Sequence, residues 1–144
     1  MIRINRFSVV SVLLLFSSLF TFACSSPSES EYDVDLTMLS STMVYSEVYN
    51  MMTVPSNYLG KSVKMNGTFS VYHDESTDKY YYACLISDAT ACCSQGIEFV
   101  LDGNYEYPSD YPPEGSEITV TGIFDTYTEG QYQYCQLINA KMSV

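Results

Sequence analysis

The sequence predicts a mainly β domain in which one amphipathic helix precedes five short strands. Three observations lead to this prediction. Apolar and polar residues alternate with a period of two in most segments after residue 62, which is the spacing of a half-buried strand. Only one segment after residue 35 has helical spacing, so no second helix is available to cross over between parallel strands. A glycine inside the first alternating segment, Gly67, indicates a bend or bulge that curls a sheet.

The predicted helix begins after a cap at Ser41 or Thr42 and ends before Pro55. Its apolar residues follow the 3.6-residue spacing of a helix face: Val44, Val48, Met51 and Met52. We expect these side chains to be core contacts rather than the lining of a ligand site.

The predicted strands are residues 63–71, 80–86, 96–101, 118–124 and 132–140. The second carries apolar side chains on both faces and is expected to be central. The inward face of the last is either Cys135 with Leu137 or Tyr134 with Ile138. Five curved strands and one helix favour a small OB-like barrel, with a small sandwich as the alternative. The helix precedes the first strand, and a loop rich in tyrosine, proline and acid (102–115) stands where an OB-fold has its helix.

The start of the chain predicts an export signal over residues 1–23. Arg3 and Arg6 form a short basic region, and an apolar stretch follows over residues 7–23. The segment Thr21-Phe22-Ala23-Cys24 resembles the bacterial lipoprotein signal, in which a cysteine is lipidated and becomes the new N-terminus. This resemblance implies lipidation at Cys24 and attachment to a membrane of the cell envelope on the exported side. Residues 24–35 are then a polar tether, and residues 36–144 form the barrel domain.

The charge of the chain argues against nucleic acid as a partner. All 17 Asp and Glu residues follow Cys24, where the only cationic side chains are four lysines, and the whole chain carries a net charge of −11. Fourteen tyrosines would supply stacking surfaces, but single-strand binding also needs a cationic groove along the phosphates.

Four cysteines remain after Cys24: Cys84, Cys92, Cys93 and Cys135. In an exported protein they predict two disulfides, and a bridge from the Cys92–Cys93 corner to Cys135 would contribute about 4 kcal/mol. The adjacent pairing of Cys92 with Cys93 is the least expected, because its ring is strained. The alternatives are a zinc site with four thiolates, for which Cys92 and Cys93 would both have to lie in an irregular loop, and unpaired buried thiols.

Three segments carry a further resemblance: residues 57–67, the Cys92-Cys93 pair before Gly-Ile-Glu-Phe, and residues 117–122. They resemble a group of small exported bacterial lipoproteins of unknown function. They are also remotely similar to the exported Cys-Cys domain of predicted permease-partner membrane proteins. The resemblance implies an OB-like barrel from Leu36 to the end of the chain, and it implies no known activity.

No arrangement of residues predicts catalysis, so we expect a protein that is not an enzyme. The single histidine, His73, lies in a charged hairpin, and no carboxylate pair has the spacing of an acid–base couple. Residues 74–78 lack the glycine and terminal glutamate of a calcium loop.

Tyrosines in the long loop form the predicted binding patch, namely Tyr105, Tyr107 and Tyr111. The sequence thus predicts a lipid-anchored, non-enzymatic barrel of the cell envelope without a cofactor. It would bind an envelope protein or a small ligand through its loops. The alternative is a zinc-handling lipoprotein whose ligands are the four cysteines.

Overall fold

The computed structural model describes residues 30–88, 90 and 92–144. The predicted signal peptide and residues 24–29 of the predicted tether, Cys24 among them, lie outside the described residues. Within the described residues, no helix has both the length and the apolar character needed to cross a membrane.

The described chain is mainly β, as predicted, with one α-helix before a six-stranded mixed sheet. The helix α2 spans Ser41–Thr53, between the short 3-10 helices η1 (Leu36–Met38) and η2 (Pro55–Asn57). The strands are β1 (Val34–Asp35), β2 (Ser62–Asp74), β3 (Lys79–Ser87), β4 (Ser94–Leu101), β5 (Glu117–Glu129) and β6 (Tyr132–Ser143).

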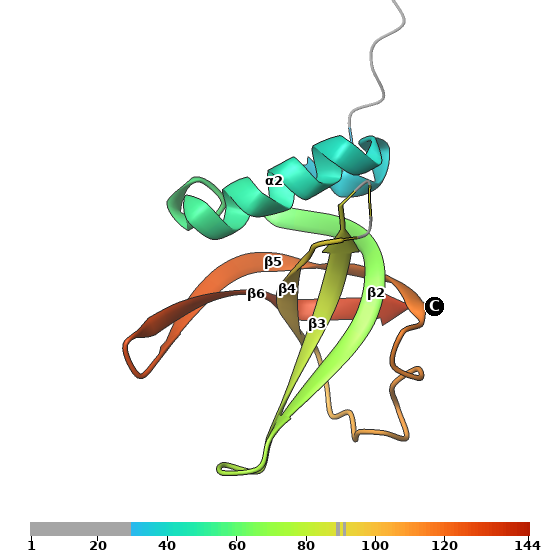
Figure 1. Ribbon diagram of the computed structural model, residues 1–144, viewed down its shortest axis with the longest axis vertical. Helices are drawn as coiled ribbons and strands as arrows, with labels where there is room; N and C mark the ends of the chain where they lie inside the picture. Colours follow the sequence, from blue (N-terminus) through green and yellow to red (C-terminus); the bar gives the residue numbers. More distant parts are fainter. Residues whose placement is uncertain (1–29, 89, 91) are drawn as a thin grey trace, which may run out of the picture.

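Five of the strands form a closed ring. The order in the sheet is β1-β2-β3-β4-β6-β5, and β5 pairs again with β2. The ring is antiparallel except where β4 runs parallel to β6, and β1 adds a parallel strand to β2. Figure 1 shows α2 over one end of the ring and the β4–β5 loop near the other.

The five predicted strands are confirmed, and each is longer in the structure than the periodicity indicated. Buried side chains alternate along β2 at Val63, Met65 and Phe69, because every second residue faces the interior. In β6 the face with Leu137 is the inward one. The alternation then shifts, since Asn139 has a φ of 50° and Ala140 is the next buried residue.

Gly67 lies where β2 exchanges one neighbour for another. Strand β2 pairs with β5 as far as Thr68 and with β3 from Thr68 onward. A Cβ on Gly67 would lie 2.7 Å from the Cys84 sulfur and would overlap the backbone oxygen of Leu85. Gly67 therefore permits the close approach of β3 to β2. The bulge that the sequence placed at Gly67 is not there, because the register shifts lie in the β4–β6 and β5–β6 pairings.

Helix α2 differs from the prediction in two details. Its N-cap is Ser40, one residue before the predicted positions. The side chains of Val48 and Met51 are fully buried, whereas Met52 is 43% exposed. Each residue turns the helix by about 100°, so Met52 lies beyond the buried face that Val48 and Met51 share. This face packs over β3, β4 and β6.

The folded domain begins earlier than the predicted boundary at residue 36. Val34 pairs with Val63 in the β1–β2 contact. The Asp33 carboxylate accepts hydrogen bonds from the backbone N–H of Ser62 at 2.8 Å and from its hydroxyl at 2.7 Å. The last residues of the predicted tether are thus bound to the ring.

Candidate functional site

The three tyrosines of the predicted patch lie together in the β4–β5 loop, but two of them, Tyr107 and Tyr111, pack against the hydrophobic core. Tyr111 stacks on Tyr82 with ring centroids 4.2 Å apart and on Phe69 at 5.7 Å. Tyr107 is also half-buried, and only Tyr105 is largely exposed. Burial raises the pKa of Tyr111 well above its usual range. The loop therefore offers less free tyrosine surface than predicted.

A larger concave surface runs along β3 and β4, and its lining includes Tyr105 and Tyr111 of the predicted patch. It consists of two pockets, of about 420 Å³ and about 370 Å³, that share Tyr81, Glu98 and Tyr127. We call the two pockets together the tyrosine groove. The remaining lining of the 420 Å³ pocket is Ser70, Tyr72, Asp74, Ala83, Glu129 and Tyr134.

The long β5–β6 hairpin forms one wall of the tyrosine groove. Strand β5 leaves β2 after Ile123, and β6 joins β4 only from Gln136 onward. Between these points the two strands pair only with each other, so the hairpin forms an arm (Figure 1). Tyr127 and Glu129 of this arm reach Glu98 and Tyr81, respectively.

Glu98 is a half-buried carboxylate at the place where the two pockets meet. The Tyr127 hydroxyl donates a hydrogen bond to its Oε2 atom at 2.7 Å. Burial raises the pKa of Glu98, and the Tyr127 hydrogen bond only partly opposes this. Among the described residues, no cationic side chain forms a salt bridge with it.

Lys79 shows how the groove accommodates an ammonium group. Its Nζ atom lies 4.4 Å from the ring centroid of Tyr81 and 5.6 Å from that of Tyr127. The same atom is 3.3 Å from Oε1 of Glu129, whose carboxylate also accepts a hydrogen bond from Tyr81 at 2.8 Å. Tyrosine faces and a carboxylate together favour a cation, through cation–π attraction and charge pairing.

Strand β3 has an unpaired backbone edge beside the groove. It pairs with β4 only between Ala83 and Ser87, and beyond Glu98 the pairing of β4 is with β6 alone. From Lys79 to Tyr82, the pairing within the described chain is with β2 alone. The 370 Å³ pocket lies at this separation, and Tyr82, Phe99 and Tyr111 contribute to its lining.

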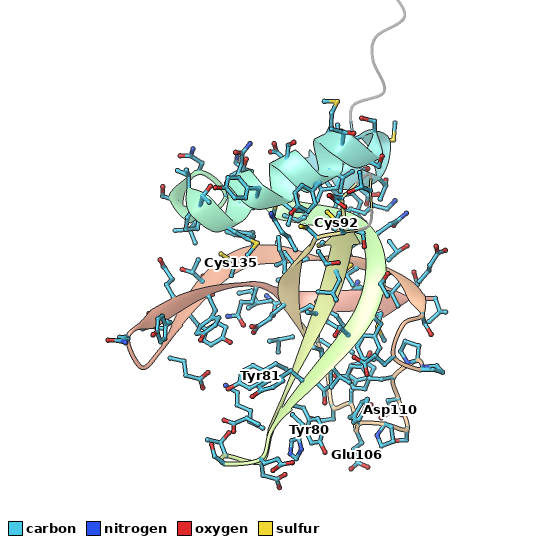
Figure 2. All side chains as sticks on the ribbon, viewed as in Figure 1. Tyr80, Tyr81, Cys92, Glu106, Asp110 and Cys135 are labelled. Carbon is cyan, nitrogen blue, oxygen red and sulfur yellow. The ribbon has the colours of Figure 1, made fainter. Side chains whose placement is uncertain are left out.

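The four cysteines are free thiols in the structure and do not form one cluster. Cys84 is fully buried in the core, where burial raises its pKa to about 12. Cys135 is half-buried and lies 3.8 Å from the backbone oxygen of Met51. Cys92 and Cys93 are exposed, and Figure 2 shows Cys92 and Cys135 at separate places. A zinc site formed by all four thiolates is thus not assembled.

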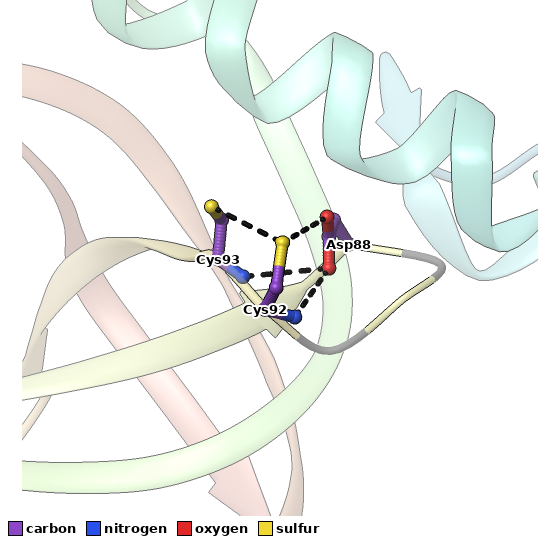
Figure 3. A group of neighbouring side chains, drawn as sticks. All are labelled: Asp88, Cys92 and Cys93. Carbon is purple, nitrogen blue, oxygen red and sulfur yellow. Dashed lines mark hydrogen bonds between the residues drawn. The ribbon is translucent and has the colours of Figure 1, made fainter.

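A different group forms in the β3–β4 loop, where Asp88 joins Cys92 and Cys93 (Figure 3). The Cys92 sulfur lies 3.3 Å from Oδ2 of Asp88 and 3.5 Å from the Cys93 sulfur. The Oδ1 atom of Asp88 accepts the backbone N–H of Cys92 at 2.9 Å, which fixes the carboxylate against the loop. Sequence reasoning missed Asp88, although its position four residues before Cys92 in the same loop is a usable signal.

His73 contacts two neighbouring side chains. Its ring stacks on Tyr80 at 4.2 Å, and its Nε2 atom lies 2.9 Å from the exposed carboxylate of Asp78. Both contacts lie near the tip of the β2–β3 hairpin.

No family model matches this chain, and no curated protein does either. The resemblances found in the sequence therefore stay predictions.

Replacing Glu98 with glutamine tests the electrostatics of the groove. The pKa of Glu98 is raised in the folded state, because burial disfavours the charged carboxylate. The contribution of Glu98 to the free energy of unfolding is therefore fully present below its ordinary pKa, where the carboxyl is protonated. It is lost as the pH rises through the pKa of the folded state. Glutamine keeps an acceptor for Tyr127 without the charge. We expect Glu98→Gln to stabilise the protein at about pH 7, by less than about 1 kcal/mol, and to be neutral at about pH 4. Thermal melts at both pH values measure this, with exposed Glu117→Gln as the control.

Proposed function

We propose that this protein is a lipid-anchored, non-enzymatic OB-like barrel of the cell envelope that binds a lysine- or arginine-bearing segment of a protein partner in the tyrosine groove. The half-buried Glu98 carboxylate, hydrogen-bonded by a tyrosine hydroxyl and without a salt-bridge partner among the described residues, is the observation that supports this most directly.

The order of the strands supports the OB-like barrel. Five strands close in the order β2-β3-β4-β6-β5, and the third and fifth of them along the chain are parallel. OB-folds bind ligands on the face of their second and third strands and through the adjoining loops. By analogy, that face corresponds here to β3 and β4, whose side chains Tyr81 and Glu98 line the groove.

The chemistry of the groove supports a cationic partner. A ligand ammonium or guanidinium beside Glu98 would form the salt bridge that this carboxylate lacks among the described residues, and the rings of Tyr81 and Tyr127 would contact its apolar stem. Lys79 already makes such contacts with the same two rings. The excess of acidic residues in the chain would also steer a basic partner toward it, and it disfavours nucleic acid.

The free edge of β3 supports a partner segment in extended conformation. Backbone groups between Lys79 and Tyr82 are available for pairing on the side of the 370 Å³ pocket. An extended segment added at such an edge gains main-chain hydrogen bonds, while pockets select alternate side chains. The lipid anchor on Cys24, predicted from the sequence, would hold this surface near envelope proteins.

A titration with a defined peptide tests this function. The probe is the acetylated, amidated peptide Gly-Thr-Lys-Thr-Gly, and its partner probe has norleucine in place of lysine. We expect the full-length protein in detergent to bind the lysine peptide more tightly. We also expect Glu98→Gln to weaken that binding by about tenfold, since it removes the charge at the centre of the groove.

The variant Glu117→Gln is the matched control, because it changes the net charge equally at an exposed position outside the groove. It should bind the lysine peptide like the unmodified protein. Equal loss of affinity in both variants would show that the peptide is held by the net charge of the protein rather than by Glu98, and it would contradict the proposal.

A further inference from the structure

The Asp88, Cys92 and Cys93 group has the spacing of ligands around one tetrahedral metal ion. With Zn–S bonds of about 2.3 Å and a Zn–O bond of about 2.0 Å, tetrahedral angles place two sulfurs about 3.8 Å apart and a sulfur and an oxygen about 3.5 Å apart. The structure has 3.5 Å between the sulfurs and 3.3 Å between Cys92 Sγ and Asp88 Oδ2. All three ligand atoms lie within 4.8 Å of one another.

The loop makes this convergence of adjacent cysteines possible. Neighbouring side chains on a strand point to opposite faces, so Cys92 and Cys93 could not approach one ion from within a strand. Strand β3 ends at Ser87 and β4 begins at Ser94, so both cysteines lie in the connection. The backbone N–H of Asp88 also donates to the carbonyl of Cys93 at 2.9 Å, which closes the base of the loop.

The ligand set favours zinc over other common ions. Calcium and magnesium take oxygen ligands, and two thiols exclude them here. A linear two-thiolate ion would need sulfurs about 4.6 Å apart at the same bond length, which is longer than the observed 3.5 Å. Two thiolates and a carboxylate are ordinary ligands of tetrahedral zinc.

We propose that Asp88, Cys92 and Cys93 bind one zinc ion in an open site. Two Zn–S bonds and one Zn–O bond form, the two thiol protons go to solvent, and a water molecule completes the fourth position. No oxidation occurs. Structural zinc sites have four protein ligands, so an exposed site with three leaves the ion open to exchange with another ligand. The site is independent of the tyrosine groove, and Figure 2 shows Cys92 close to α2 and far from Tyr81.

Metal titration of the full-length protein in detergent, kept reduced with a phosphine, tests this site. The zinc affinity is measured by competition with a chromophoric chelator, and the stoichiometry by native mass spectrometry. We expect one zinc per chain, and we expect Cys92→Ser and Cys93→Ser each to weaken binding by about a hundredfold. Asp88→Asn should weaken it by about tenfold.

Two further measurements distinguish zinc in this loop from zinc bound elsewhere on the chain. Cys135→Ser is the matched control, since Cys135 lies outside the group, and it should leave zinc binding unchanged. Cobalt as a probe should give a thiolate-to-cobalt charge-transfer band that Cys92→Ser weakens.

The proposal is overturned if the reduced protein binds no zinc, or if the Cys92 and Cys93 variants bind it as tightly as the unmodified chain.

Discussion

Replacing Phe69 with alanine is expected to destabilise the protein by about 3–5 kcal/mol, which is a large share of the stability of a domain of this size. Phe69 is fully buried and lies among the rings of Tyr82, Phe99 and Tyr111. Its removal leaves a cavity between the ring of strands and the β4–β5 loop, and the flat neighbouring rings fill such a space poorly.

Denaturant unfolding measures this loss, with Tyr72→Ala on the exposed face of the same strand as the control. We also expect proteolytic cleavage in the β4–β5 loop to become faster in Phe69→Ala, because Tyr111 loses its stacking partner. A loss of stability below about 1 kcal/mol would mean that the loop does not depend on Phe69.

Gly67→Ala is expected to be the second most damaging single change, costing about 1–3 kcal/mol or more despite adding only a methyl group. That methyl would meet the backbone oxygen of Leu85 and the sulfur of the buried Cys84. A flexible side chain could move aside, but backbone in the middle of β3 cannot move without disturbing its pairing with β2 and β4.

The neighbouring Asn66→Ala serves as the control for Gly67→Ala, since Asn66 is exposed on the same strand. Thermal unfolding of the two variants should differ by several degrees. Equal melting temperatures would show that β3 can move away from β2 at this point, so that the close approach of the two strands would not require glycine.

The strands were predictable because each has one face in the core, and burial of one face imposes a period of two. The same period places Glu98, between the buried Ile97 and Phe99, on the outward face of its strand. Met52 was assigned to the core wrongly, because helical spacing alone does not say which side of a wide apolar face meets the sheet. That choice depends on where α2 lies on β3, β4 and β6.

The tyrosine groove could not be predicted from local patterns, because five strands contribute to its lining. Tyr81 and Tyr127 are 46 positions apart in the sequence, and only the long β5–β6 arm brings them together on either side of Glu98. The cysteines show the same limit. The sequence shows how many cysteines there are. It does not show that Cys84 is buried or that Asp88 lies beside Cys92, because both depend on the fold.

The most direct test of groove binding is to map where the lysine peptide contacts the protein. Amide chemical shifts of the isotopically labelled full-length protein in detergent would be followed as the peptide is added. We expect the largest changes on β3 between Lys79 and Tyr82, at Glu98, and at Tyr127 of the β5–β6 arm, with little change for the norleucine peptide. Changes that leave out Tyr81, Glu98 and Tyr127, which both pockets share, or equal changes with both peptides, would contradict the assignment of the tyrosine groove as a site for cationic side chains.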